Sequence, residues 1–179
     1  MILCANPKAQ YSAKKSEINA AILNVLESGT YILGEQVSLF EQEFAEYLEI
    51  NYAIGCASGT DALVLALKAL DIGLGDEVIV PSHTAVPTVA AVVLSGAIPV
   101  FVDIEQNYFT MSPEMVQEAC TDKTKAIIAV HLYGQSCAMD ELMEICRHRD
   151  LRMIEDCAQA TGASYRGKKL GTIGDIGCF

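Results

Sequence analysis

The sequence predicts an α/β fold of three layers, in which a mostly parallel sheet is covered by helices on both faces. Short apolar segments alternate with segments of helical length along most of the chain. The apolar segments are continuous, without interleaved polar residues, which is typical of parallel strands buried on both faces. Hydrophobic residues make up 51% of the 179 residues, enough for a sizeable core.

Two amphipathic helices are expected before this alternation begins. Residues 14–28 and 36–49 carry apolar side chains at helical spacing, and Gly29 is a typical end signal for the first helix. We therefore expect an N-terminal helical segment, residues 1–50, followed by a region of alternating strands and helices, residues 51–179.

Strands and helices are expected in turn from residue 51 onward. The expected strands are residues 52–56, 77–80, 99–102, 125–130 and 152–155, with another beginning near residue 174. The expected helices are residues 58–70, 84–95, 113–120 and 140–148. Pro87 fits only in the first turn of its helix, and Ser112 is the expected N-cap of the next one. Residues 165–171 are expected to form a small polar hairpin or loop.

Charge and cysteine content exclude several classes of function. The net charge is −11, from 12 basic and 23 acidic residues, which disfavours nucleic acids and anionic membranes as partners. The 7 cysteines form no CxxC pair and the start of the chain lacks a secretory pattern, so we expect reduced thiols in the cytoplasm. The 3 histidines have no ligand spacing, so no metal site is expected.

The stretch of residues 78–102 is almost free of charge, which raises the alternative of a membrane span. Pro81, Pro87, Gly96 and Pro99 divide it into pieces of strand and helix length. We therefore interpret the stretch as strand, helix and strand.

An acidic residue at the end of the strand expected at 152–155 is the most informative indication of function. The sequence there reads RMIEDCAQA, so the strand leads into Asp156 and then into small residues. Ligands of open α/β sheets bind beyond the carboxyl ends of the strands, where a carboxylate calls for a cationic partner. The protonated ring nitrogen of pyridoxal 5'-phosphate (PLP) is one such partner. The alternative is an N-cap or a solvated acid at a strand end.

A second motif, SGTD at residues 58–61, lies at a strand-to-helix turn. Free N–H groups and the helix dipole make such a turn suitable for an anion, and the Thr60 hydroxyl adds a donor. Serine, threonine and aspartate are also ordinary N-caps, so this motif alone is ambiguous. Neither a GxGxxG nor a Walker A sequence is present. A phosphate site after one strand and an acid after another would together hold the two ends of PLP.

Several longer motifs occur in a fixed order along the chain. They are Ala9–Tyr11, Gly29–Gly34, Ser58–Leu63, Gly75–Thr84, Pro99–Asp103, Thr124–Ile128, His131–Gln135, Ile154–Ala160 and Gly174–Phe179. Together they resemble the DegT/StrS family of PLP-dependent aminotransferases of nucleotide-linked keto-sugars. The resemblance implies the large domain of a type I PLP-aminotransferase, and it covers only about the first half of a family member.

The resemblance also implies roles for individual residues. Thr60 and the backbone N–H of Asp61 match the positions that bind the cofactor phosphate. Asp156 matches the acid that pairs with the pyridine nitrogen, and Gln159 matches the residue that contacts the 3-hydroxyl side of the ring.

Further candidates for cofactor binding are Gly59, His83 and Ala85. Some family members carry an aromatic ring at the position of Ala85, so stacking by that side chain is in doubt here. His83, nearby, either compensates in part for the missing ring or packs in the core or behind the residues that touch the cofactor. Two other residues, His131 and Tyr133, follow a buried strand; they either line the pocket or belong to the hydrogen-bonded core.

The catalytic lysine of the family falls beyond Phe179. We therefore expect a chain truncated before the Schiff-base lysine and the small C-terminal domain, and inactive by itself, because transamination needs that amine. Lys168 and Lys169 lie in the polar segment and are expected to be solvated. No catalytic residue is therefore assigned within the chain.

The function implied for the whole protein is transfer of an amino group, with glutamate as the expected donor, to a nucleotide-linked keto-sugar. Such sugars serve polysaccharide, lipopolysaccharide or antibiotic biosynthesis, and a homodimer is expected. One alternative is a PLP-dependent sugar dehydratase of the same family, in which histidine replaces the lysine. Another is a non-enzymatic regulatory module that keeps the fold. A nicotinamide oxidoreductase is supported only by the alternation of strands and helices.

Overall fold

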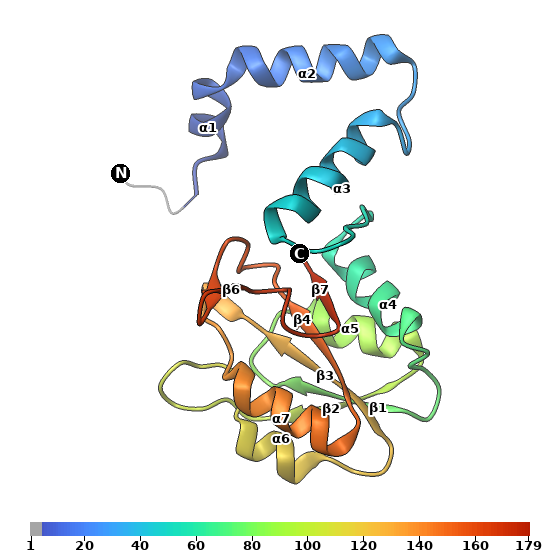
Figure 1. Cartoon of the computed structure of the whole chain (residues 1–179), viewed down its shortest axis with the longest axis vertical. Helices are drawn as coiled ribbons and strands as arrows, with labels where there is room; N and C mark the ends of the chain where they lie inside the picture. Colours follow the sequence, from blue (N-terminus) through green and yellow to red (C-terminus); the bar gives the residue numbers. More distant parts are fainter. Residues whose placement is uncertain (1–4) are drawn as a thin grey trace. The chain divides into compact units, whose positions relative to one another are not determined.

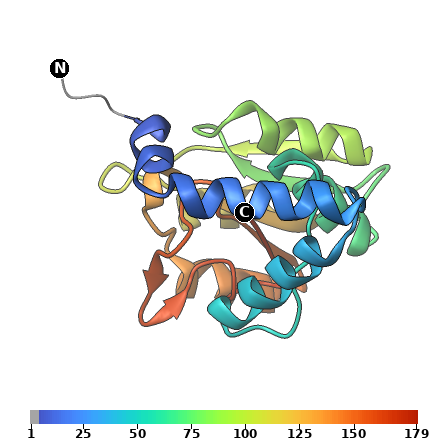
Figure 2. The same ribbon diagram turned by 90° about the horizontal axis from the view of Figure 1, so that it is seen from above.

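The computed structural model describes residues 5–179 and divides the chain into two compact units, one ending at Gly55 and the other running from Cys56 to Phe179. The described part of the first unit consists of helices that follow one another along the chain, drawn in blue to cyan in Figure 2. These are α1 (Pro7–Ala13), α2 (Lys15–Ser28) and α3 (Glu35–Leu48). The two helices predicted in this part of the chain are confirmed.

Helix α1 was not predicted, although its signals are visible in the sequence. The side-chain oxygen of Asn6 accepts the N–H of Ala9 at 3.1 Å, and Pro7 occupies the first helical position. Helix α2 ends as predicted at Gly29, whose φ of 70° lies in the left-handed region that glycine adopts without strain.

The second unit alternates strands and helices, as predicted (Figure 1). The strands of its main sheet are β1 (Glu77–Pro81), β2 (Ile98–Val102), β3 (Thr124–Val130), β4 (Arg152–Asp156) and β7 (Ile176–Cys178). The helices are α4 (Gly59–Ala69), α5 (Val86–Ser95), α6 (Pro113–Ala119) and α7 (Met139–Arg149), with a short 3-10 turn, η1 (Leu132–Gly134). Ser112 caps α6, and Pro87 lies in the first turn of α5, both as predicted.

The strands of the main sheet are all parallel, in the order β2-β1-β3-β4-β7. Helices α4 and α5 cover one face and α6 and α7 the other (Figures 1 and 2). Successive side chains of a strand point to opposite faces. On β3, Ile128 therefore belongs to the core under α4 and α5, whereas Ile127 belongs to the core under α6 and α7. The prediction of a three-layer α/β fold with a parallel sheet is confirmed.

Residues 52–56 do not form a strand, which corrects one expectation. An isolated strand is not stable, because its backbone groups need a neighbouring strand as hydrogen-bond partner. Within residues 5–179 no strand pairs with this segment. The side chains of Tyr52 and Ile54 are accordingly exposed.

The polar segment before β7 contains a hairpin of two short antiparallel strands, β5 (Ser164–Tyr165) and β6 (Lys168–Lys169). Arg166 and Gly167 connect them, with φ values of 48° and 85°. Two successive residues at positive φ are typical of the two-residue turn that suits the twist of a hairpin. Of the two alternatives left open for this segment, the hairpin is confirmed.

Candidate functional site

A topological switch point lies between β1 and β3. The chain leaves β1 through α5 on one face of the sheet, and it leaves β3 toward α7 on the other face. Because the two loops diverge, a crevice is expected at the carboxyl ends of these strands, where α/β sheets bind ligands. His83 follows β1 and Tyr133 follows β3, and their ring centroids lie 6.1 Å apart with the planes tilted by 58°. Both side chains are exposed.

Asp156 ends β4, the next strand of the sheet, and is only 7% exposed. Its Oδ2 accepts a hydrogen bond from the Thr88 hydroxyl at 2.9 Å, and its Oδ1 accepts the N–H of Ala158 at 3.2 Å. The Thr88 oxygen in turn lies 2.8 Å from the Thr84 hydroxyl oxygen. The residues that follow Asp156 form a turn and no helix. Asp156 is therefore neither a helix cap nor a solvated acid.

The N-terminus of α4 is held by its cap. The Ser58 side chain accepts the N–H of Asp61 at 3.2 Å and donates its own hydrogen to Oδ2 of Asp61 at 2.9 Å. The N–H of Asp61, one of the expected anion donors, is thus already engaged. Within residues 5–179 no hydrogen bond is formed by the N–H groups of Gly59 and Thr60 or by the Thr60 hydroxyl. These three donors are the ones that α4 offers to an anion.

Strand β7 connects this turn with Asp156. Cys178 is the neighbour of Asp156 in the register of β4 and β7, and the N–H of Cys157 donates to its carbonyl at 2.7 Å. A Cβ placed on Gly59 would lie 3.8 Å from the carbonyl oxygen of Phe179, so the end of β7 reaches the start of α4. Neighbouring strands are about 4.8 Å apart. Strand β7 therefore lies between the free donors of α4 and the carboxylate of Asp156: it pairs with β4 on one side and contacts the start of α4 at Phe179.

Gln159 links two of the loops at the carboxyl ends of the strands. Its Oε1 accepts the backbone N–H of Tyr133 at 2.8 Å. Tyr133 has a φ of 57°, a conformation that residues other than glycine adopt rarely and that is frequent at functional sites. Because Oε1 is engaged, the side-chain NH₂ group is what Gln159 can offer to a ligand.

The remaining residues singled out in the sequence lie in different surroundings. Ala85 is the N-cap residue of α5 and is exposed, so no side-chain ring occupies that position. His131, left open between pocket and core, is fully buried and belongs to the core, whereas Tyr133 is 74% exposed. Lys168 is exposed and Lys169 is half-buried in the β5–β6 hairpin.

Glu155 is a key residue of this region that the sequence did not single out. Its carboxylate is fully buried and accepts the backbone N–H groups of Gly171, Ile173 and Gly174 at 2.7–2.8 Å. It also lies 3.0 Å from Nε2 of His131. Burial by itself raises the pKa of Glu155, but the hydrogen bonds outweigh it, so the pKa is lowered. The signal in the sequence was the acidic pair at the end of the strand, of which only the second member drew notice.

His131, Glu155 and Cys157 bring their ligand atoms within 4.8 Å of one another, a grouping that the histidine spacing did not predict. Both carboxylate oxygens of Glu155 are already hydrogen-bonded, and Nδ1 of His131 accepts the N–H of Cys137 at 3.1 Å. Burial raises the pKa of the Cys157 thiol, which opposes the thiolate that a metal would need. These donors fit a hydrogen-bond network better than a metal site.

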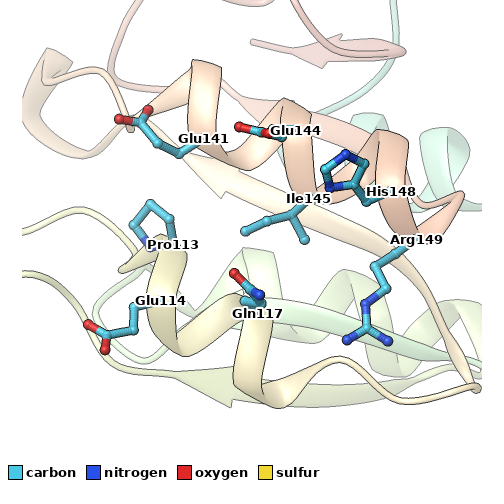
Figure 3. Close-up of a pocket in the computed structure, with 8 residues that line it drawn as sticks. All are labelled: Pro113, Glu114, Gln117, Glu141, Glu144, Ile145, His148 and Arg149. Carbon is cyan, nitrogen blue, oxygen red and sulfur yellow. The ribbon is translucent and has the colours of Figure 1, made fainter.

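A groove of about 510 Å³ lies between α6 and α7 and is lined by side chains of both helices (Figure 3). The carboxylates of Glu114 and Glu141 lie at one end of it and His148 and Arg149 at the other. A third carboxylate, Glu144, also lines it. Three carboxylates would repel a phosphate, so this groove is a poor site for an anionic cofactor.

Two further observations bear on the sequence-based expectations. None of the helices in the described part of the chain combines the length and the apolar character that a membrane crossing requires. The cysteines among residues 5–179 are all free thiols; Cys4 lies outside the described residues.

Comparison with known proteins shows one family for this chain. The model of the DegT/DnrJ/EryC1/StrS aminotransferase family matches residues 12–179. The dTDP-3-amino-3,6-dideoxy-alpha-D-galactopyranose transaminase of Aneurinibacillus thermoaerophilus is 50% identical over 92% of this chain and 46% of its own length. The UDP-N-acetyl-3-dehydro-alpha-D-glucosamine 3-aminotransferase of Acidithiobacillus ferrooxidans is 46% identical over 96% of this chain and 47% of its own length. The chain spans about half the length of the curated relatives it matches.

Solved structures give the same result for the fold. Streptomyces venezuelae DesV superposes with a TM-score of 0.91 at 48% identity, over 93% of this chain and 45% of its own. A DegT DnrJ EryC1 StrS aminotransferase from Brucella abortus superposes with a TM-score of 0.92 at 36% identity, over 99% of this chain and 49% of its own.

Three other relatives bear on the cofactor and on the two alternative functions, a sugar dehydratase and a regulatory protein. Spr1654 of Streptococcus pneumoniae, solved in a PLP form, superposes with a TM-score of 0.84 at 32% identity, over 87% of this chain and 44% of its own. GDP-4-keto-6-deoxymannose-3-dehydratase (ColD) superposes with a TM-score of 0.83 at 35% identity. A pleiotropic regulatory protein of Geobacillus stearothermophilus is 44% identical over 95% of this chain.

Proposed function

The chain belongs to the DegT/DnrJ/EryC1/StrS aminotransferase family, and we propose that it is the cofactor-binding part of a PLP-dependent aminotransferase acting on a nucleotide-linked keto-sugar. The observation that carries the proposal is the buried Asp156 carboxylate at the end of β4, fixed by hydrogen bonds at both oxygens. The relatives named as transaminases of dTDP- and UDP-linked sugars support the class of substrate.

The residues present fit PLP at both of its polar ends. The N–H groups of Gly59 and Thr60 and the Thr60 hydroxyl are donors for a phosphate, and Asp156 provides a negative charge for a protonated ring nitrogen. The N–H of Asp61 is engaged by the N-cap Ser58, and the Asp61 carboxylate in turn accepts the Ser58 hydroxyl, so Asp61 takes part by holding the cap that shapes the start of α4. When bound, PLP supplies the electron sink that amino-group transfer requires.

Gln159, His83 and Asp156 would hold and orient the ring of the cofactor. Gln159 would offer its NH₂ group to the oxygen on the 3-hydroxyl side of the ring, since Oε1 is held by Tyr133. His83 lies on the loop that carries an aromatic ring at the position of Ala85 in some family members, and it would provide a flat side chain close to Tyr133. Asp156 keeps the proton on the ring nitrogen, because a carboxylate at this position favours the charged form of its partner.

The amino donor, assembly and location are further parts of the proposal. Glutamate is the proposed donor and the whole protein is proposed to be a homodimer, both from the family resemblance. The free thiols among the described residues support a reducing compartment such as the cytoplasm. The lysine that binds the cofactor is proposed to lie in a part of the full-length protein outside residues 1–179.

The test uses the full-length protein that contains this chain. Purified protein is mixed with PLP, glutamate and a set of dTDP-, UDP- and GDP-linked keto-sugars, and products are identified by mass spectrometry. A product in which the keto oxygen is replaced by an amino group supports the proposal. The 179-residue chain alone is expected to give no turnover, and turnover by it would contradict the assignment of the catalytic amine to another segment.

Two alternatives are supported by specific relatives and are separated by the same assay. The match to ColD favours a dehydratase, which would remove an oxygen from the sugar without leaving an amino group on it. The match to a pleiotropic regulatory protein favours a non-enzymatic role, in which no product forms with any of the sugars.

A further inference from the structure

Thr88 is a buried polar residue whose hydroxyl contacts two other polar side chains. It is fully buried in the first part of α5, and its hydroxyl lies 2.9 Å from Oδ2 of Asp156 and 2.8 Å from Oγ1 of Thr84. Burying a hydroxyl costs free energy unless it is hydrogen-bonded. Valine would fill the same space at no such cost, so the presence of threonine calls for a reason.

The direction of the hydrogen bonds follows from chemistry. A carboxylate only accepts, so Thr88 donates its single hydrogen to Asp156. The bond between the two threonines must then be donated by Thr84. The result is a directed chain from Thr84 through Thr88 to the carboxylate.

The hydrogen bonds from Thr84 to Thr88 and from Thr88 to Asp156 fix the plane of the Asp156 carboxylate. Oδ2 is held by Thr88 and Oδ1 by the N–H of Ala158, so both oxygens are restrained from the protein side. Thr84 lies on the loop after β1, between His83 and Ala85, and this loop leaves the sheet at the switch point, where a ligand crevice is expected. Thr88, which orients the carboxylate, lies in α5, and Thr84, its own hydrogen-bond partner, lies on the loop after β1.

We propose that Thr88 is a positioning residue that aims Asp156 at the ring nitrogen of the cofactor, and that Thr84 sets the direction in which Thr88 donates. The proposal rests on the proposed function, because the orientation of Asp156 affects a ligand only where PLP binds. It makes Thr84 and Thr88 determinants of cofactor binding although neither needs to touch the cofactor.

The test compares variants of the full-length protein loaded with PLP. Thr88→Val removes the hydroxyl and keeps the shape, Thr88→Ser restores the hydroxyl, and Thr84→Val removes the second donor. Thr110→Val is the matched control, since Thr110 is another buried threonine that forms no hydrogen bond to Asp156. The readouts are the dissociation constant of PLP and the absorption spectrum of bound PLP as a function of pH.

Thr88→Val is expected to raise the dissociation constant about tenfold, the effect of one hydrogen bond to a charged group, and to shift the pH at which the spectrum changes. Thr88→Ser and Thr110→Val are expected to match the unmodified protein, and Thr84→Val to change the spectrum in the same direction as Thr88→Val. If Thr88→Val fails to fold, Thr84→Val carries the test, because Thr84 is only half-buried. A Thr88→Val protein with unchanged affinity and spectrum would overturn the proposal, as would a Thr88→Ser protein as defective as Thr88→Val.

Asp156→Asn separates failure of this inference from failure of the proposed function. If Asp156→Asn leaves the affinity and spectrum of bound PLP unchanged, the cofactor assignment itself is wrong. If Asp156→Asn changes them and Thr88→Val does not, only the positioning role of Thr88 is wrong.

Discussion

Glu155 and His131 are joined inside the second unit by a hydrogen bond of 3.0 Å between Oε2 and Nε2, and neither side chain is exposed. Nδ1 of His131 accepts the N–H of Cys137, so the ring proton is on Nε2 and is donated to Glu155. With the backbone donors at residues 171–174, this gives a buried carboxylate whose two oxygens are both satisfied. The pair anchors the segment that leads into β7.

Glu155→Gln is expected to destabilise the protein strongly. The amide keeps the shape but turns an NH₂ group toward donors that need an acceptor, which leaves buried N–H groups unpaired. We expect the free energy of unfolding to fall by about 3 kcal/mol. Urea denaturation followed by circular dichroism measures this. The matched control is Glu118→Gln on the exposed surface of α6, which should change stability by less than about 0.5 kcal/mol; equal effects of the two variants would contradict the anchoring role.

The lowered pKa of Glu155 predicts a specific loss of stability in acid. Burial tends to raise this pKa, but hydrogen bonds from His131 and from the N–H groups of Gly174, Gly171 and Ile173 outweigh it. A carboxyl group whose folded pKa is depressed stabilises the fold above its unfolded pKa of about 4.3, and this contribution is lost as the pH falls further. The urea concentration at the unfolding midpoint should therefore decrease when the pH is lowered below about 4. The midpoint of Glu155→Gln should not show this part of the pH dependence.

Asp156→Asn is expected to separate chemistry from folding. The amide oxygen can still accept the N–H of Ala158, and its NH₂ group can donate to the Thr88 oxygen if the threonine hydroxyls reverse direction. The free energy of unfolding should therefore change by about 1 kcal/mol or less. Turnover by the full-length protein should fall roughly 100-fold or more, because the charge opposite the ring nitrogen is lost. Near-normal turnover would remove the central residue from the cofactor assignment.

Ser58→Ala and Thr60→Val are expected to affect different properties: the first the stability of the protein, the second its affinity for PLP. Ser58 caps the helix, so its loss should cost about 1 kcal/mol of stability, measured by thermal or urea unfolding. The Thr60 hydroxyl forms no hydrogen bond within the described residues, so Thr60→Val should leave stability nearly unchanged. Its dissociation constant for PLP should instead rise about tenfold. An unchanged constant would argue against Thr60 as a phosphate donor.

Gly177→Ala is expected to disrupt β7, whereas Gly59→Ala is not expected to disturb α4. A Cβ at Gly177 would collide with the backbone carbonyl of Gly171, and the backbone would have to move. A Cβ at Gly59 meets only the Phe179 oxygen, at the ordinary contact distance of 3.8 Å. We expect Gly177→Ala to lower the free energy of unfolding by about 2 kcal/mol or more and Gly59→Ala to leave it unchanged or slightly higher. A stable Gly177→Ala protein would show that β7 can shift.

The fold was largely predictable because its signals are local. Continuous apolar strands, caps such as Ser112 and end signals such as Gly29 depend on residues close in sequence. The expected strand at residues 52–56 was wrong because strand formation depends on a partner, which the composition of a segment does not reveal. Helix α1 was missed because it is short and none of its residues is buried, so it has no apolar periodicity to detect.

The candidate site was predictable only in part. Position at a strand end pointed to Asp156, and the helix N-terminus pointed to Thr60. Thr88 lies 68 residues from Asp156 in sequence, and Glu155 is bonded to a loop 16 to 19 residues away. Such contacts arise from tertiary packing, and no short motif encodes them. The engagement of the Asp61 N–H by Ser58 also depends on a rotamer that the sequence does not specify.

The alternation of side chains along β4 places two neighbouring acids on opposite sides of the sheet. Glu155 bonds to His131, whereas Asp156 bonds to Thr88. Substitutions of Glu155 should reduce the yield of folded protein, whereas Asp156→Asn should leave the yield nearly intact and lower turnover. Variants at two adjacent positions thus distinguish a loss of folding from a loss of activity. In a screen of random variants, they provide an internal standard for assigning each defect to one cause or the other.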